Sequence, residues 1–339
     1  MTRRSLPSPM LAKPTRALVR AVACCALPAL LAAGAGVAHA ADAYPAQPVR
    51  LIVPFPPAGG TDVLSRLVFN KIGMATKWNV VVENRAGAGG NIGLDSVAKA
   101  KPDGYTLGMG QTANLAINPT LYPRMPYNAQ KDFTPVALVA AQPVVLIVRN
   151  DAPYKTVADL VAAAKAKQLS MASAGTGTVG HLTGEMFARR AGIRMLHVPY
   201  KGASPALTDL MGGQTDFYFA TPPIAMPMIK AGKVRALAVT SAKRMPLLSA
   251  VPTVAESGYA GFQAEDWKAL VAPAGTPPEV VARLNAEVNK ALAQADTVSK
   301  LREEGSEPRG GTARELGAFI QSENMRWGEI VRQSGARVE

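Results

Sequence analysis

Short runs of apolar residues alternate with longer segments in which apolar residues recur every three or four positions. The short runs have the length of buried strands, and they predict strands at 49–54, 80–83, 106–108, 136–139, 144–149, 169–172, 195–198, 217–220, 236–240 and 270–273. The longer segments predict helices at 62–72, 92–100, 157–167, 181–191, 204–211, 222–231, 278–293 and 313–334. Because alternating strands and helices are typical of βαβ units, we expect an α/β fold with mostly parallel sheets.

Two interruptions of this pattern suggest domain boundaries. The apolar strand VVLIVRN breaks into DAPY at 151–154, ahead of a helix, and a second break spans 258–266. A chain with two such breaks would leave one lobe, build a second lobe and return to the first. We therefore expect lobe I at 41–150 and 263–339, and lobe II at 151–262.

Residues 1–40 have the features of a secretory signal peptide. Five basic residues and no acidic one lie within 1–20, an apolar stretch follows at 21–38, and Ala38-His39-Ala40 is a small-x-small cleavage sequence. A membrane span needs about 20 apolar residues, and this shorter stretch also contains a proline and two glycines. Removing 40 of the 339 residues leaves 299, and the loss of five positive charges lowers the net charge from +13 to +8. We expect an exported, periplasmic protein.

The composition of the remaining chain narrows its partners. Both cysteines lie in the signal segment, so the exported chain needs no disulfide. Lys and Arg are spread along the chain without runs and without interleaved aromatic residues, so we expect no nucleic-acid partner. A net positive charge in such a protein favours small anions.

Three strand-to-helix turns are rich in glycine: PFPPAGGTD at 54–62, NRAGAGGNIG at 84–93 and SAGTGTVGH at 173–181. Glycine lets a ligand approach the backbone closely, and the free N–H groups and positive dipole end of a helix start attract an anion. One such turn is ordinary in α/β folds. Three of them, two before the first break and one after it, predict an anion held between the lobes.

The third turn also fits the dinucleotide-binding pattern G-x-G-x-x-G at 175–180. The acid that would bind the ribose hydroxyls about 20 residues further on is missing, because no Asp or Glu lies between 185 and 209. Arg194 and Lys201 could instead meet the 2′-phosphate of NADP. An exported NADP-linked or other α/β enzyme is therefore the alternative to a binding protein.

Residues that could form a catalytic centre are scarce. The exported chain has no cysteine, no G-x-S-x-G sequence, and only two histidines, His181 and His197, whose spacing makes no metal site. Asp62 follows Gly-Gly-Thr and is interpreted as a helix-start residue rather than a general base. We expect no catalytic residue, no metal and no cofactor, and hence no enzyme.

Eight segments, in order, resemble the Bug-type periplasmic receptors of tripartite tricarboxylate transporters. They are VPFPPAGGTD, NRAGAGGNIG, KPDGYTL, SAGTGTVGHLTGEMF, VPYKGASPALTDLMGGQTDF, KVRALAVTSAKR, VPTVAESG and APAGTPPEVVARLN. The resemblance covers essentially the whole exported chain. It implies a type II periplasmic binding fold, with two α/β lobes joined by two crossing strands and a cleft that closes over a small organic carboxylate. It also implies delivery of that ligand to the membrane subunits of a tripartite tricarboxylate transporter. We expect the receptor to be a monomer.

The resemblance further implies which residues hold the ligand. In the family, backbone and hydroxyl groups of the first and third glycine turns bind one carboxylate, often with ordered waters. Carried onto this sequence, the ligand-binding residues are Phe55, Ala58, Gly59, Gly60, Thr61, Asp62 and Ala88 in the first lobe, with Ser173, Thr176, Gly177, Thr178 and His181 in the second. Family members often have Ser where this chain has Thr178, whose added methyl narrows the pocket mouth. A backbone cradle reads only the carboxylate, so a dicarboxylate, a tricarboxylate, an acidic amino acid and an aromatic acid stay open as ligands.

Overall fold

The computed structural model of the protein describes residues 44–338. Gln47–Glu339 forms one compact unit, which contains both β-sheets. The expected signal peptide at 1–40 lies outside the described residues. Within 44–338, no helix combines the length and the apolar character that crossing a bilayer requires.

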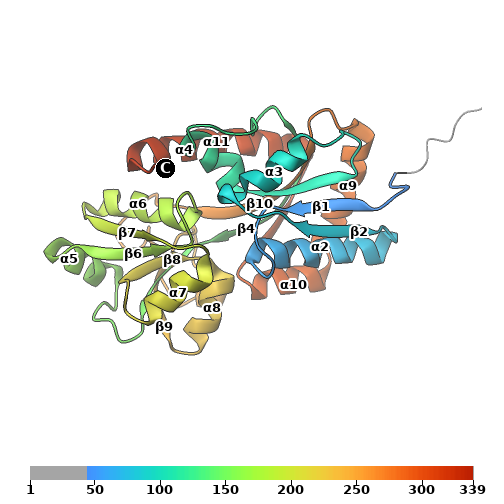
Figure 1. The fold of residues 1–339 in the computed structure, drawn as a ribbon. Coiled ribbons are helices and arrows are strands. Elements are labelled where there is room, and N and C mark those ends of the chain that lie inside the picture. Colours follow the sequence, from blue (N-terminus) through green and yellow to red (C-terminus); the bar gives the residue numbers. More distant parts are fainter. Residues whose placement is uncertain (1–43, 339) are drawn as a thin grey trace, which may run out of the picture. The chain divides into compact units, whose positions relative to one another are not determined.

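The first sheet has six strands in the order β11-β4-β10-β3-β1-β2. They are β1 (Val49–Val53), β2 (Val80–Asn84), β3 (Thr106–Gln111), β4 (Phe133–Pro143), β10 (Glu265–Pro273) and β11 (Glu307–Gly310). β1 runs parallel to β2 and β3, whereas β10 is antiparallel to β3 and β4. In Figure 1, α3 (Asn91–Ala98) and α11 (Ala313–Ser334) lie above this sheet, and α2 (Gly60–Thr76) and α10 (Ala295–Glu303) lie below it. α9 (Pro278–Leu292) packs against β4 and α2.

The second sheet has five strands in the order β7-β6-β8-β5-β9. They are β5 (Val145–Arg149), β6 (Leu169–Ser173), β7 (Met195–Pro199), β8 (Phe217–Ala220) and β9 (Val234–Val239). β6 is parallel to β7 and β8, and β5 is antiparallel to β8 and β9. In Figure 1, α6 (Val179–Ala191) lies above the sheet, α7 (Ala203–Met211) and α8 (Pro222–Lys230) lie below it, and α5 (Val157–Ala166) lies at its left.

Most of this pattern follows from the sequence, and the expected α/β class is confirmed. The expectation of mostly parallel sheets is wrong: both sheets are mixed, because β10 runs antiparallel to β3 and β4, β11 to β4, and β5 to β8 and β9. All ten predicted strands and all eight predicted helices are present, with ends that differ by a few residues. β11, α10, the π-helical turn η2 (Ala113–Ile117) and the short α4 (Asn118–Leu121) were not predicted. β11 has only four residues, and α10 is short and rich in polar residues, so local pattern gives only a weak signal for them.

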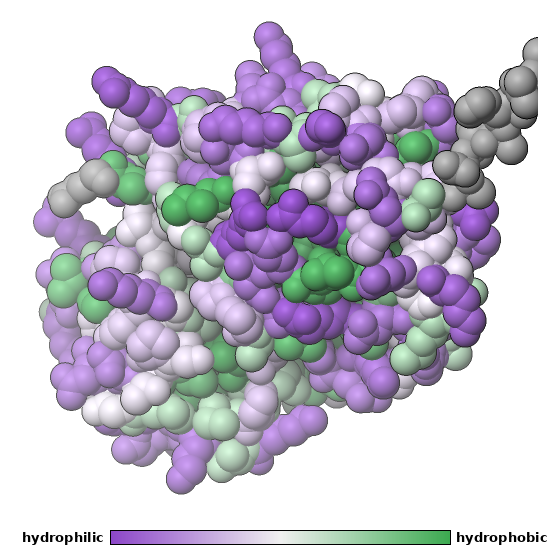
Figure 2. Space-filling view, turned by 45° about the vertical axis from the view of Figure 1, so that its right-hand side comes forward, coloured by the Kyte–Doolittle hydropathy of each residue, from purple (hydrophilic) through white to green (hydrophobic). Residues whose placement is uncertain are grey.

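Apolar side chains fill the space between the sheets and their helices. The largest fully buried ones include Trp267, Trp327, Phe69, Phe187 and Phe217. On the face seen in Figure 2, hydrophilic residues predominate, and hydrophobic residues gather in a few places, one of them a hollow ringed by hydrophilic residues.

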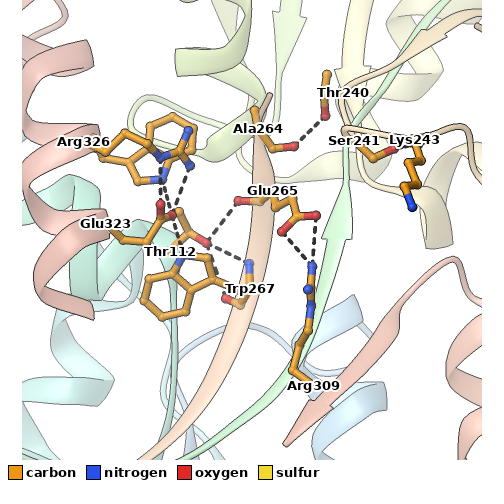
Figure 3. A network of polar contacts seen from close by, with 11 residues as sticks. Thr112, Thr240, Ser241, Lys243, Ala264, Glu265, Trp267, Arg309, Glu323 and Arg326 are labelled. Atoms are coloured by element: carbon orange, nitrogen blue, oxygen red, sulfur yellow. Dashed lines mark hydrogen bonds and ion pairs between the residues drawn. The ribbon is translucent and has the colours of Figure 1, made fainter. Parts of the chain in front are cut away.

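The chain passes from the first sheet to the second at Val144 and returns between β9 and β10. Thr240, fully buried, joins the two crossings. Its hydroxyl donates to Ala264 O at 2.7 Å (Figure 3), and it accepts from the Val144 N–H at 2.9 Å. The boundary at 150/151 taken from the sequence lies one strand after this change of sheet, because an apolar strand can join either sheet. Movement of the two sheets as separate lobes stays a prediction.

A buried carboxylate fixes β10 to α11. The indole N–H groups of Trp267 and Trp327 both donate to Glu323 Oε2, at 2.8 and 2.9 Å, and Arg326 Nε donates to Glu323 Oε1 at 2.7 Å (Figure 3). Successive residues of a strand point to opposite faces. Asp266 and Lys268, the two residues that flank Trp267, therefore point away from α11.

Candidate functional site

A cavity of about 890 Å³ lies between elements of the two sheets, a size that suits a small organic ligand. It is lined by strand-to-helix turns, helix starts, parts of strands from both sheets, and the end of α10. The segments are 55–61, 178–180 and 201–205, parts of β3, β4, β8 and β10, several residues of 221–230, and Glu303 with Glu304.

The first glycine turn presents the start of α2 to this cavity. Gly59 has φ −78°, and Gly60 also lies outside the left-handed region, so neither position needs glycine for its backbone conformation. A Cβ on Gly60 would have Pro223 as its nearest neighbour, at 3.7 Å, and a Cβ on Gly59 would have Pro56 O at 3.5 Å. A side chain could therefore start at either position without a clash, yet both are glycine at a helix start, where the first N–H groups have no acceptor within the helix.

Asp62 does not line the cavity, and its side chain instead holds the glycine turn by hydrogen bonds. Its carboxylate accepts from the Ala58 N–H at 2.9 Å, from Arg66 Nε at 3.0 Å and from Asn84 Nδ2 at 2.9 Å. Burial by itself would raise the pKa of Asp62, but these hydrogen bonds and the Arg66 charge outweigh it and lower the pKa. The bond from Ala58 holds that residue at a positive φ of 61°.

Thr61 lies in the cavity wall, but its hydroxyl already has a partner. The hydroxyl donates to Gln111 Oε1 at 2.5 Å, which ties the first turn of α2 to the end of β3. Thr61 can therefore offer a ligand its backbone N–H more readily than its side chain.

The third glycine turn presents the start of α6 to the same cavity. Thr178 caps the helix: its hydroxyl accepts from the His181 N–H at 3.4 Å and donates to Gly175 O at 2.8 Å. Thr178 and Gly180 both line the cavity. A Cβ on Gly180 would lie 2.3 Å from Phe219 O, so this glycine allows α6 to pack directly on β8.

Two stacked histidines support this turn from inside the lobe. The His181 and His197 ring centroids are 3.8 Å apart. His181 Nδ1 accepts from the Gly177 N–H at 3.2 Å, and His197 Nε2 lies 2.6 Å from the Ser173 hydroxyl, which also accepts from the Gly175 N–H. Burial and the neighbouring His181 lower the pKa of His197 to about 3, so His197 is neutral at pH 7.

The structure brings half of the sequence-predicted residues to the cavity. Phe55, Ala58, Gly59, Gly60, Thr61 and Thr178 line it. The cavity lining does not include Asp62, Ala88, Ser173, Thr176, Gly177 and His181. Ala88 is exposed, in the short helical turn η1 (Ala88–Gly90), and a Cβ on Gly90, the last residue of that turn, would lie 3.1 Å from the Phe55 ring. The second glycine turn thus supports the first.

Several lining residues were missed by the sequence analysis. Gln111, Gln142, Asp266 and Lys268 come from strands, and Glu303 and Glu304 end α10. Burial and the neighbouring Glu303 raise the pKa of Glu304. The signal that could have found the first group is a charged pair, Asp266 and Lys268, within the otherwise apolar strand EDWKALVAP.

The glycines of the third turn serve packing within the protein. A Cβ on Gly177 would lie 2.4 Å from the Leu121 side chain, and Gly180 packs on β8.

Within the described residues, no three His, Cys, Asp or Glu are grouped as a metal site would require.

Two α/β sheets joined by two chain crossings, with a cavity lined from both, define a two-lobe solute-binding protein of the periplasmic type. Residues 65–336 match the family described as "Tripartite tricarboxylate transporter family receptor". The chain belongs to this family, which confirms the resemblance and the expected fold.

Curated relatives match along almost the whole chain. A protein of Pseudomonas sp. (strain P51), described as "UPF0065 protein in tcbD-tcbE intergenic region", is 43% identical over 293 residues, which cover 86% of this chain and 87% of the relative. Protein BugT of Bordetella pertussis (strain Tohama I) is 38% identical over 310 residues, which cover 91% and 95%.

Comparison with solved structures leads to the same class of protein. "R. palustris Rpa4515 with adipate" is 38% identical, with a TM-score of 0.83, over 87% of this chain and 100% of that one. MatC (Rpa3494) from Rhodopseudomonas palustris with bound malate is 34% identical, with a TM-score of 0.78, over 85% and 100%. These comparisons point to solute-binding receptors, so the alternative of an NADP-linked enzyme is not favoured.

Proposed function

We propose that this protein is a periplasmic, monomeric receptor that captures one small organic carboxylate and delivers it unchanged to the membrane subunits of a tripartite tricarboxylate transporter. The family supports the transporter partner, and the relatives with adipate and malate support a carboxylate ligand. The cavity between the two sheets supports capture by closure of lobe I over lobe II.

One observation carries the proposal for the site. Gly59 and Gly60 have backbone angles open to any residue, yet both lack a side chain where α2 begins at the cavity wall. Glycine at these positions lowers stability, and the backbone conformation does not require it. Room for a ligand therefore explains why both residues are glycine. A carboxylate at this point accepts hydrogen bonds from the free N–H groups of α2 and meets the positive end of its dipole.

The start of α6 completes this site from the other sheet. α2 has 17 residues and α6 has 13, and both begin at the cavity wall. In the proposal, the six lining residues named above contact the ligand. Asp62, Ala88, Ser173, Thr176, Gly177 and His181 act by holding the turns in place.

Calorimetric titration with a carboxylate panel tests this function, with Gly60→Val as the variant. The valine side chain would occupy the place of the carboxylate, so we expect a folded variant that no longer binds. A ligand at 100 times its dissociation constant should stabilise the unaltered protein by about 2.7 kcal/mol. A folded Gly60→Val protein with undiminished affinity would contradict the proposed cradle. Recovery of a chemically altered acid after incubation would contradict a pure receptor.

A further inference from the structure

Four polar side chains lie side by side on one face of the first sheet and form what we call the polar floor: Gln111, Gln142, Asp266 and Lys268. In the strand register, Lys268 of β10 is opposite Gln111 of β3, and Asp266 of β10 is opposite Gln142 of β4. Opposite residues on neighbouring strands share a face of the sheet, as do residues two apart along one strand. All four line the cavity, and none is more than 9% exposed.

The polar floor adjoins the start of α2. The Thr61 hydroxyl bonds to Gln111 at one edge of the floor, and the Ser306 hydroxyl donates to Gln142 Oε1 at 2.7 Å at the other edge. A ligand whose carboxylate lies on the first N–H groups of α2 and that extends along this wall therefore meets the floor with its other end.

The ion pair in the floor has unused hydrogen-bonding capacity. Lys268 Nζ donates to Asp266 Oδ2 at 2.6 Å, and Gln142 Nε2 lies 3.4 Å from the same oxygen. Asp266 Oδ1 is buried and has no hydrogen-bond partner among the described residues. Replacing a buried ion pair by apolar residues is often neutral or stabilising, so stability gives no reason to keep this one. An unpartnered buried oxygen is costly until a donor reaches it.

The other charges around the cavity do not favour a polyanion. Among residues 44–338, the charged residues of the lining are Lys201, Lys230, Lys268, Asp266, Glu303 and Glu304, three of each sign, and no arginine lines the cavity. Arginine is the residue best suited to bind a carboxylate with two parallel hydrogen bonds. The helix starts therefore supply the attraction for an anion, and they suit a single carboxylate.

We propose that Asp266 and Lys268 select the ligand by its far end, and that this end carries a hydrogen-bond donor, either an ammonium or a hydroxyl group. This inference rests on the proposed function and names its substrate class: amino or hydroxy acids with the donor remote from the carboxylate. Asp266 lines the cavity, but its Oδ1 atom has almost no accessible surface, so the donor reaches Oδ1 when the Asp266 side chain turns toward the ligand, while Lys268 keeps the carboxylate paired. A second ligand carboxylate would be repelled by Asp266, and a methyl group would leave Oδ1 unpartnered.

Titration calorimetry with matched acids tests the inference on the full-length exported protein. The six-carbon set is hexanoate, 6-hydroxyhexanoate, 6-aminohexanoate and adipate, and the four-carbon set is butyrate, 4-hydroxybutyrate, 4-aminobutyrate and succinate. At the chain length that fits better, we expect the amino or hydroxy acid to bind at least about 10-fold more tightly than the plain acid and the diacid. Equal or tighter binding of the plain acid or the diacid would overturn the inference and leave the proposed function standing. If no acid of either set binds, the inference fails, and the wider carboxylate panel decides the proposed function.

An isosteric variant tests whether the polar floor causes the preference for a ligand with a hydrogen-bond donor at its far end. In Asp266→Asn, we expect the amino acid to lose its advantage over the plain acid, and the diacid to gain affinity because the Lys268 charge is no longer paired. Asp151→Asn is the matched control, because Asp151 is an exposed acid that pairs with Arg149 away from the cavity lining. An unchanged ranking in Asp266→Asn would show that the pair is structural only. If that variant does not fold, the ranking measured on the unaltered protein decides.

Discussion

Replacing Gly60 with Ala should stabilise the empty protein and weaken its binding of carboxylate. The added Cβ meets nothing closer than Pro223 at 3.7 Å, which is an ordinary van der Waals contact, and the backbone at Gly60 needs no glycine. A Gly to Ala change at such a compatible position stabilises by about 0.4–1 kcal/mol, chiefly because the unfolded chain loses conformational freedom. For a domain of this size, that corresponds to a rise in melting temperature of about 1–3 °C.

The same methyl group enters the space in which the proposed carboxylate lies. A carboxylate bound to the N–H groups of α2 must approach them to about 2.9 Å. We therefore expect Gly60→Ala to lose at least about 10-fold in affinity, which corresponds to about 1.4 kcal/mol. Thermal melting without ligand measures the first effect, and calorimetric titration with the tightest-binding acid of the panel measures the second.

Gly317→Ala is the matched control for this experiment. Gly317 lies within α11, lines no part of the cavity, and would place its Cβ 3.5 Å from Pro135. It should gain stability in the same way and bind as the unaltered protein does. The reasoning is refuted if Gly60→Ala keeps full affinity, or if it melts below the unaltered protein.

Thr240→Val removes the buried hydroxyl that joins the two chain crossings, and we expect it to lower the free energy of unfolding in urea by about 1–3 kcal/mol; an unchanged midpoint would contradict this role. Glu323→Leu leaves two buried indole N–H groups without their acceptor and should cost at least about 3 kcal/mol in the same assay, so a milder loss would contradict the anchor between β10 and α11. Between pH 7 and pH 5, stability should fall by about 1 kcal/mol, because an unfolded histidine binds a proton near pH 6.5 whereas burial holds the pKa of His197 at about 3. This contribution is complete above pH 6.5 and is lost as the pH falls toward 3, and the His197→Asn protein should lack it.

Much of the fold could be predicted from the sequence because its strands and helices carry strong local patterns. VRLIV at β1 is an apolar run bounded by turn residues, and α9 has apolar residues on one face. β11 could not be found this way: its sequence, EPRG, becomes a strand only because β4 offers it an edge. The sheet that β5 joins is likewise decided by packing, since an apolar strand fits either one.

Some residues of the candidate site could likewise be predicted from the sequence, and others could not. The first glycine turn was found because its residues are contiguous and their chemistry is local. Asp62 and His181 lie in the same turns, but their side chains point into hydrogen-bond networks within the lobes, a direction that no linear pattern records. The polar floor was missed because Gln111, Gln142 and Asp266 come together only through the register of three strands that are distant in sequence.

Backbone amide shifts measured during titration with a binding carboxylate would test the central claim most directly. The cradle proposal predicts that the amide protons of Gly60 and Thr61 move strongly downfield, in step with the binding curve, because they become donors to a carboxylate oxygen. Gly317, within α11, should not move. Saturable binding that leaves the Gly60 and Thr61 amides unshifted would contradict the claim that the start of α2 holds the ligand.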